Sequence, residues 1–404
     1  MRNAVRGYDW GSRTALAALQ GRAPSGEHEA ELWMGAHPLA PSLLVVGGEA
    51  GGHGHEVSLA EMITADPSGV LGEATFTRFG PRLPFLLKVL AVERALSVQV
   101  HPGQGRAAAR FAEEEALGLP VGSDKRTYVD PYAKPEFLYA LTEFDALAGL
   151  RTADDAAGLL GLLDLPDLDG ALSALSAGTG REAVRTALAR LLHMPDGERR
   201  RFADDAARRA EELLAAGGRH LAEGERAALR VLVRLRGEHP GDVLVVAPLL
   251  LRLHRLPPGG TIFLPTGVPH AYLGGLAVEI MATSDNVLRA GLTTKHVDAE
   301  ELLAALDPDA DAQVHRPESG EGVQTWPVPV PEFRLARLEV TGSVCVPTAP
   351  SGPSVVLCTG GRVEVHCLGD AVALGGGESA FVPDGSGDLV LQGAGEVFVA
   401  TPGS

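Results

Sequence analysis

Apolar and polar residues alternate along residues 95–102, which read Ala-Leu-Ser-Val-Gln-Val-His-Pro. This alternation, ended by a Pro-Gly pair, predicts a β-strand that runs into a turn. Successive side chains of a strand point to opposite faces. One face would carry three aliphatic residues, Leu96, Val98 and Val100. The other would carry Ser97, Gln99 and His101, and this row of polar groups needs a partner, for which a metal ion is the simplest choice.

Two further strand-like runs contain charged residues. Residues 83–90 read Leu-Pro-Phe-Leu-Leu-Lys-Val-Leu. Lysine is rarely buried without a partner, so Lys88 is either a strand-end residue that extends to solvent or an anion ligand that faces a cavity. Lys134 and Glu136 lie two residues apart, directly before another apolar strand. In an extended chain these two side chains would share one face.

Helical periodicity dominates the middle of the chain. Residues 104–120 form a predicted helix with Gly118 and Pro120 as stops. From about 151 to 236 the composition shifts to Ala, Leu, Arg and Glu at helical spacing, and Thr152 with Asp155 resembles a capping box. Helices are predicted in this region at 181–193, 198–216 and 223–236. Pro195-Asp-Gly197 and Gly217-Gly218 separate them, so the region resembles an all-helical insertion between strands.

Strand character returns at Val243. His270 then follows a turn rich in glycine and proline and precedes a strand, on which Glu279 shares a face with Ala277 and Met281. The last eighty residues contain short strands with glycine-rich turns. Five positions recur there at a fixed offset: Leu256, Gly259, Phe263, Pro265 and Gly267 match Leu374, Gly377, Phe381, Pro383 and Gly385. Two sheets of similar design, of jelly-roll type, are therefore predicted, with Asp388 in the second at the position of His270.

Length and charge narrow the classes of function. A chain of 404 residues suits two or three domains. The formal net charge of −17 disfavours nucleic acid and anionic lipid as partners, and an anionic substrate would need a local basic pocket. The three cysteines, Cys345, Cys358 and Cys367, fit reduced thiols in a cytosolic protein. Residues 1–8 lack an apolar run, so we expect no secretory signal, a cytoplasmic location and no membrane partner.

Four residues are the candidate metal ligands: Gln99, His101, Glu136 and His270. Two imidazoles, one carboxylate and one amide oxygen suit zinc, with iron or manganese as alternatives. Their net charge of −1 would leave a divalent ion with Lewis-acid character. A second cluster, His53, His55 and Glu56, lies among glycines at 47–56, which favour a mobile loop that cannot hold ligands in place.

The chain resembles type I phosphomannose isomerases, which are zinc enzymes of the cupin superfamily. Seven motifs carry the resemblance in the family's order: Tyr8-Asp-Trp-Gly11, Glu31-Leu-Trp-Met-Gly-Ala-His-Pro38, the runs at 83–90 and 95–102, Lys134-Pro-Glu136, Pro269-His-Ala-Tyr272 and Ser284-Asp-Asn-Val-Leu-Arg-Ala-Gly-Leu292. The resemblance places the family's ligands for one zinc ion on Gln99, His101, Glu136 and His270, and its catalytic arginine on Arg289. It also implies a monomer.

The implied reaction interconverts mannose 6-phosphate and fructose 6-phosphate through an enediol, in GDP-mannose synthesis or mannose catabolism. Arg289 would stabilise developing charge on oxygen. The family's histidine before Lys-Pro-Glu is replaced by Ala133, so proton transfer would fall to Lys134, Glu279 or a metal-bound water, with Lys134 preferred. Predicted phosphate ligands are Lys88, Ser97 and Lys295.

The predicted fold is mainly β with an α insertion: two cupin-type jelly-roll barrels plus an all-helical inserted domain. The catalytic barrel would comprise 1–150 and 237–324, the helical insertion 151–236 and the C-terminal barrel 325–404. A non-catalytic cupin that binds sugar phosphates is the alternative function, since fold alone does not determine activity. Gln99 argues against an iron oxygenase, which would normally offer more histidines.

Overall fold

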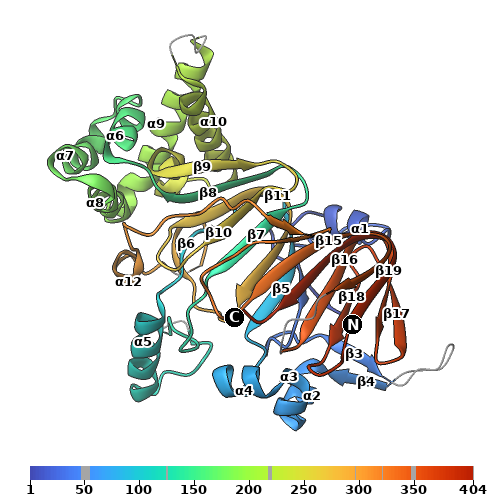
Figure 1. Ribbon diagram of the computed structural model, residues 1–404. Helices are drawn as coiled ribbons and strands as arrows, with labels where there is room; N and C mark the ends of the chain where they lie inside the picture. Colours follow the sequence, from blue (N-terminus) through green and yellow to red (C-terminus); the bar gives the residue numbers. More distant parts are fainter. Residues whose placement is uncertain are drawn as a thin grey trace.

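The computed structural model describes residues 1–46, 55–123, 126–216, 221–295, 297–320, 322–346 and 352–403 (Figure 1). Antiparallel sheets and helices make up the fold. The first sheet contains ten strands: β1 (Ala4–Arg6), β2 (Glu31–Met34), β5 (Phe85–Val92), β6 (Val98–Val100), β7 (Glu136–Ala140), β8 (Phe144–Leu150), β9 (Leu251–Leu256), β10 (Thr261–Leu264), β11 (His270–Ala282) and β12 (Leu288–Gly291). Two short strands, β3 (Leu43–Val46) and β4 (His55–Ser58), pair separately.

Strand β11 organises the first sheet because it pairs along its length with four other strands. Its first residue, His270, lies opposite Gln99 of β6 and Ala148 of β8. Further along, Glu279 lies opposite Lys88 of β5 and Leu138 of β7. Side chains at directly opposed positions share a face of the sheet. The register of β11 therefore gathers polar side chains from segments that are far apart in sequence.

Helices cover one side of this sheet (Figure 1). Those of the middle region are α6 (Ala153–Gly161), α7 (Asp169–Ala177), α8 (Gly180–Leu192), α9 (Asp196–Ala215) and α10 (Glu223–Glu238), with the 3₁₀ helix η1 (Pro166–Leu168) between α6 and α7. Thr152 caps α6 by accepting a hydrogen bond from the Asp155 amide, which is one of the two hydrogen bonds of the predicted capping box. The helices share one hydrophobic core with Val98 and Val100, so the predicted apolar face is confirmed for these two residues, whereas Leu96 lies before β6 and packs against another core.

The expected return to strand at Val243 is wrong. Residues Val243–Val246 form the 3₁₀ helix η2, Ala247–Leu250 form α11, and the strand β9 begins only at Leu251. The Asp242 side chain accepts a hydrogen bond from the Leu244 amide and so begins the helical turn. Because the run is buried on every side, it has no alternation by which a strand could be distinguished from a helix.

The remaining helices are α1 (Ala15–Leu19), α2 (Leu59–Ala65), α3 (Pro67–Leu71), α4 (Glu73–Phe79), α5 (Gln104–Ala116) and α12 (Ala299–Ala305). Helix α5 confirms the helix predicted at 104–120, which ends shortly before Gly118. Of the separators predicted between the middle helices, Gly217 and Gly218 lie outside the described residues. No helix within the described ranges has both the length and the apolar character needed to span a membrane.

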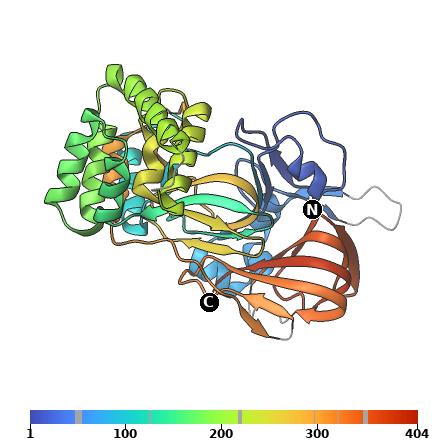
Figure 2. The ribbon, with the colours of Figure 1, turned by 90° about the horizontal axis from the view of Figure 1, so that it is seen from above.

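The C-terminal sheet lies beside the first sheet, away from helices α6 to α10 (Figure 2). Its seven strands are β13 (Glu318–Gly320), β14 (Val323–Thr325), β15 (Arg334–Val346), β16 (Ser354–Cys367), β17 (Asp370–Gly375), β18 (Ser379–Val382) and β19 (Leu389–Thr401). The sequence repeat is also conformational, because Gly259 and Gly377 have φ of 85° and 74° in the turns before β10 and β18. The two sheets share a core in which Tyr139 packs against Trp326 and Phe398.

Candidate metal centre

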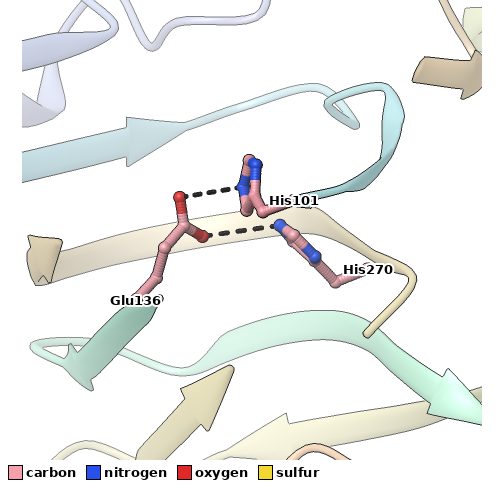
Figure 3. Close-up of side chains that lie close together, drawn as sticks. All are labelled: His101, Glu136 and His270. Carbon is pink, nitrogen blue, oxygen red and sulfur yellow. Dashed lines mark ion pairs between the residues drawn. The ribbon is translucent and has the colours of Figure 1, made fainter. Parts of the chain in front are cut away.

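Three of the four predicted ligands converge at the ends of adjacent strands (Figure 3). His101 follows β6, Glu136 opens β7 and His270 opens β11. Nε2 of His101 lies 3.1 Å from Oε1 of Glu136, and Nε2 of His270 lies 3.4 Å from Oε2. All three side chains are buried. Their ligand atoms lie within 4.8 Å of one another, and this is the one group of His, Cys, Asp or Glu in the described part of the chain that could hold a metal ion.

Backbone carbonyls fix the tautomers of both histidines. Nδ1 of His101 lies 2.9 Å from the Asn286 carbonyl oxygen, and Nδ1 of His270 lies 3.0 Å from that of Val268. A carbonyl only accepts, so each Nδ1 carries the proton and each Nε2 presents a lone pair to the Glu136 carboxylate. Lone pairs that face a carboxylate repel it unless a cation lies between them. The donor set therefore fits a divalent metal ion.

Gln99, the fourth predicted ligand, is placed by the strand register. It lies opposite His270 on one side and Arg289 of β12 on the other. Its side chain is half-buried and lines the cavity next to the metal group. The described structure gives no direct contact between the Gln99 side chain and the three converging residues.

The charges within the group favour metal binding. Burial, aided by the nearby Lys134 ammonium, lowers the pKa of His101 to about 4. Burial alone would raise the pKa of Glu136, but Lys134 and His101 hold it well below its usual range. The Lys134 nitrogen lies 2.6 Å from Oε1 of Glu136 and 3.4 Å from Nε2 of His101. At neutral pH the imidazole is neutral and the carboxylate is ionised, as ligation requires.

A second buried network surrounds Lys88. Its ammonium lies 3.3 Å from Oε2 of Glu279 and 3.9 Å from Oε1 of Glu31. Burial raises the pKa of Glu279, as does the charge of Glu136, and the Tyr272 hydroxyl donates to Glu279 at 2.9 Å. Lys88 is only 6% exposed, so the alternative of a residue that extends to solvent is wrong. Sequence reasoning had assigned no role to Glu31 or Tyr272, although both lie in quoted motifs.

A cavity of about 350 Å³ opens beside the metal group. Its walls include Ser97, five cationic side chains (Lys88, Arg94, Lys134, Arg289 and Lys295) and four acidic ones (Asp9, Glu31, Glu238 and Asp285). The cationic side chains outnumber the acidic ones here, whereas the chain as a whole has a net charge of −17, so the cavity favours an anion more than the rest of the protein does. Burial lowers the pKa of Arg289. Neither Arg289 nor Lys295 has a hydrogen bond or ion pair from its side chain to another described residue, and the Lys295 ammonium lies 5.6 Å from the Tyr8 ring centre.

Asn286 links two parts of the site and was missed in the sequence. Besides its carbonyl contact with His101, its side-chain oxygen accepts from the Val129 amide at 3.0 Å. Its amide nitrogen donates to the Asp130 and Tyr132 carbonyls, in the segment that leads to Lys134. The only local signal was its place in the motif at 284–292.

The alternative cluster at 47–56 gains no support from the described residues. His53 lies outside them. His55 and Glu56 are exposed on β4, and Glu56 pairs with Arg2 at 2.8 Å.

Comparisons with known proteins agree on one family. The family model "Phosphomannose isomerase type I, catalytic domain" matches residues 1–153. The chain is 35% identical to the mannose-6-phosphate isomerase of Escherichia coli (strain K12), over 98% of this chain and 97% of that protein. It is 30% identical to mannose-6-phosphate isomerase 2 of Arabidopsis thaliana, over 98% and 90%.

Solved structures give the same relationship. A mutant of phosphomannose isomerase from Salmonella typhimurium superimposes with a TM-score of 0.86 at 32% identity, covering 100% of this chain and 98% of that chain. A zinc-bound mannose 6-phosphate isomerase gives a TM-score of 0.83 at 32% identity, with the same coverage.

Proposed function

The chain belongs to the type I phosphomannose isomerase family, and from that premise we propose that Gln99, His101, Glu136 and His270 hold the zinc ion of a mannose-6-phosphate isomerase. The observation that carries the proposal is the meeting of His101, Glu136 and His270, with both Nε2 lone pairs aimed at one carboxylate beside a cavity that Lys134 and Arg289 line. The reaction interconverts mannose 6-phosphate and fructose 6-phosphate by moving a proton between C1 and C2 through an enediol. One bound zinc ion per chain supplies a Lewis acid for the oxygens on which charge develops.

Arg289 stabilises the same developing charge. Its guanidinium lines the cavity and has no competing partner among the described side chains, so its donors are free for substrate oxygens. A guanidinium stays charged at neutral pH even where burial lowers its pKa. Preorganised donors of this kind lower the barrier because they need no rearrangement as charge forms.

Lys134 is the preferred proton carrier. It lines the cavity, whereas Glu279 lies behind the wall with one oxygen bonded to Tyr272 and the other near Lys88. A general base must come within hydrogen-bonding reach of the proton that it removes. Ala133 provides no imidazole at the position where the family usually has one, which leaves Lys134, a lining residue of the cavity, as the preferred group.

The phosphate group of the substrate is held by Ser97 and Lys295, while Lys88 in the same cavity wall has a lesser part. Ser97 and Lys295 both line the cavity, and the Lys295 side chain has no carboxylate partner among the described residues. The charge of Lys88 is already balanced by Glu279 and Glu31, so it attracts an anion less strongly. Lys88 therefore contributes mainly by holding those carboxylates in place.

The fold proposal follows from the family and from the glycine repeat of the two sheets. Two cupin-type jelly-roll barrels would lie at 1–150 with 237–324 and at 325–404, with a helical insertion at 151–236. The free thiols of Cys345, Cys358 and Cys367 support a cytoplasmic location. We further propose a monomer with a small sugar phosphate as its partner, and neither nucleic acid nor membrane, in keeping with the net charge of −17.

A coupled assay with mannose 6-phosphate, with and without a chelator, tests the function. Isomerisation that disappears with the chelator and returns with zinc is the expected result. A zinc-loaded protein that binds the sugar phosphate without turnover would instead support the non-catalytic cupin. Turnover that persists in fully metal-free protein would remove zinc from the mechanism.

A further inference from the structure

The C-terminal end of helix α10 reaches the active-site strands from the helical layer. Glu238 and His239 line the cavity, and they are the only residues to do so among the described residues between 153 and 250. Polar side chains here bond to the backbones of three segments that lead to or from site residues. We infer that Arg234, Glu238, His239 and Asp242, together called the α10 clamp, are positioning residues for the isomerase site. This inference rests on the proposed function.

The first segment held by the clamp precedes β6. Oε2 of Glu238 accepts a hydrogen bond from the Ala95 amide at 2.8 Å, and Nε2 of His239 lies 3.3 Å from the Ala95 carbonyl oxygen. In return, Arg94 donates to the Glu238 carbonyl at 2.8 Å. Ser97 and Gln99 follow two and four residues after Ala95. The helix end thereby sets where β6 begins and how its polar face meets the cavity.

The second segment lies in β11, three residues after the ligand His270. Nη2 of Arg234 donates to the Leu273 carbonyl at 2.7 Å and to the Glu93 carbonyl at 3.2 Å. The β8–β11 pairing shifts register between Tyr272 and Gly274, so the ladder is irregular at Leu273. Arg234 supplies a donor at that irregularity. Its Nε also bonds Oε1 of Glu238 at 2.6 Å, so one guanidinium joins the helix, the residue that follows β5 and strand β11.

The third segment follows β12, which carries Arg289. Oδ2 of Asp242 accepts from the Leu292 amide at 2.6 Å, while its Oδ1 accepts from the Leu244 amide. Leu292 lines the cavity and has a φ of 55°, a left-handed conformation that is rare for a leucine. A Cβ at Gly291 would lie 2.7 Å from Oδ1 of Asp242, so only glycine permits this approach. Asp242 thus stabilises the strained turn after Arg289.

Helix α10 also provides a matched control. Arg236 lies two residues from Arg234 and pairs with Asp204 of α9, within the helical layer. Removal of Arg236 deletes the same residue type from the same helix without touching a site strand.

Arg234→Ala and Glu238→Ala should raise the KM for mannose 6-phosphate by roughly tenfold or more, since small displacements of positioning groups carry large kinetic costs. Zinc content should stay at one ion per chain, and Arg236→Ala should match the wild type.

A structural measurement accompanies the kinetics. Hydrogen–deuterium exchange at the Ala95 amide should speed up in Glu238→Ala but not in Arg236→Ala, because only the former removes its acceptor. Glu238→Gln keeps an acceptor oxygen, so its KM should lie close to the wild-type value. A purely electrostatic role of Glu238 would predict a KM like that of Glu238→Ala. If Arg234→Ala fails to fold, Glu238→Ala and Glu238→Gln carry the test.

Failure of the inference and failure of the proposed function are distinguishable. An active wild type whose Glu238→Ala variant keeps the wild-type KM and Ala95 exchange would overturn the clamp alone. An equal loss in Arg236→Ala would also overturn it, since that result indicates general weakening of the helical layer. A wild type that does not isomerise mannose 6-phosphate would reject the proposed function itself.

Discussion

The ammonium of Lys88 lies 3.3 Å from a carboxylate oxygen of Glu279, and both side chains are almost completely buried. The two residues are direct cross-strand partners on β5 and β11. Burial alone would lower the pKa of Lys88, but Glu31 and Glu279 together raise it, so the ammonium stays charged. The Lys88 ammonium already interacts with two carboxylates of the protein. We therefore expect a mutation of Lys88 to affect the stability of the protein more than its affinity for the substrate.

Replacement of Lys88 should cost stability before it costs substrate affinity. Removal of one partner of a buried ion pair leaves the other charge uncompensated, at roughly 3–5 kcal/mol. Lys88→Met should lower the free energy of unfolding in urea by that order, whereas Lys88→Met with Glu279→Gln should recover part of it. A loss in the double variant equal to the sum of the losses in Lys88→Met and in Glu279→Gln alone would indicate that the two charges are not energetically coupled.

Zinc and activity should be lost together when an imidazole of the metal group is removed. His270→Ala deletes one Nε2 ligand and should reduce bound zinc, measured by metal analysis, along with turnover. Added zinc should then raise the melting temperature of the wild type far more than that of the variant, because a ligand stabilises the state that binds it. His193→Ala is the control, since the partners of that exposed histidine among the described residues are Glu300 and the Ala189 carbonyl, both far from the metal group in the sequence. A zinc-free His270→Ala enzyme with full activity would contradict the mechanism.

Those parts of the site could be predicted from the sequence that leave a pattern in a short stretch of it. The polar face of β6 followed from strict alternation, and the position of His270 at the start of β11 followed from the turn before it. The run Val243–Leu250 was assigned wrongly because uniform burial leaves no period to detect.

Contacts between segments that are far apart in the sequence leave no local pattern from which they could be predicted. Asn286 reaches Asp130, and Glu238 reaches Ala95, across more than a hundred residues. The pairing of Lys88 with Glu279 depends on the β5–β11 register, which the two strand sequences do not specify, because both faces of each are buried. Strand faces, ligand chemistry and family resemblance predicted four ligands, of which the structure brings three together, and only the structure supplied the groups that orient them.

The metal-free protein should lose stability as the pH falls from 6.5 to about 4. The pKa of His101 is lowered to about 4 from an ordinary 6.5, mainly by burial and secondarily by Lys134. When the pKa of a group is lower in the folded than in the unfolded protein, the group stabilises the fold fully at pH values above its unfolded-state pKa. This stabilisation disappears as the pH falls to the folded-state pKa. The loss should be on the order of 3 kcal/mol, measured by urea unfolding after chelation. His101→Gln should flatten this part of the profile, and an unchanged slope would rule out His101 as its source.

Arg289→Ala should fold and bind zinc but turn over slowly. Loss of one preorganised donor at a developing oxyanion costs roughly 10²–10³ in kcat. The KM should change less, since the contact strengthens in the transition state. Arg289→Lys keeps the charge but loses the planar fork and should recover only part of the rate. A wild-type kcat in Arg289→Ala would show that the unpaired guanidinium has no role in the chemistry.

The identity of the proton carrier can be decided between Lys134 and Glu279, because Lys134 lines the cavity and Glu279 is not among its lining residues. Lys134→Ala should lower kcat by roughly 10²–10⁴, the usual contribution of a positioned acid or base, while zinc content stays at one ion per chain. Added methylammonium should restore part of the lost rate, because a small amine can occupy the space that the side chain leaves.

Glu279→Ala should respond differently. Its main effect should be a loss of stability through Lys88, and neither acetate nor methylammonium should rescue turnover. Rescue of Glu279→Ala by acetate, with no rescue of Lys134→Ala by amines, would reverse the assignment and make the buried carboxylate the base.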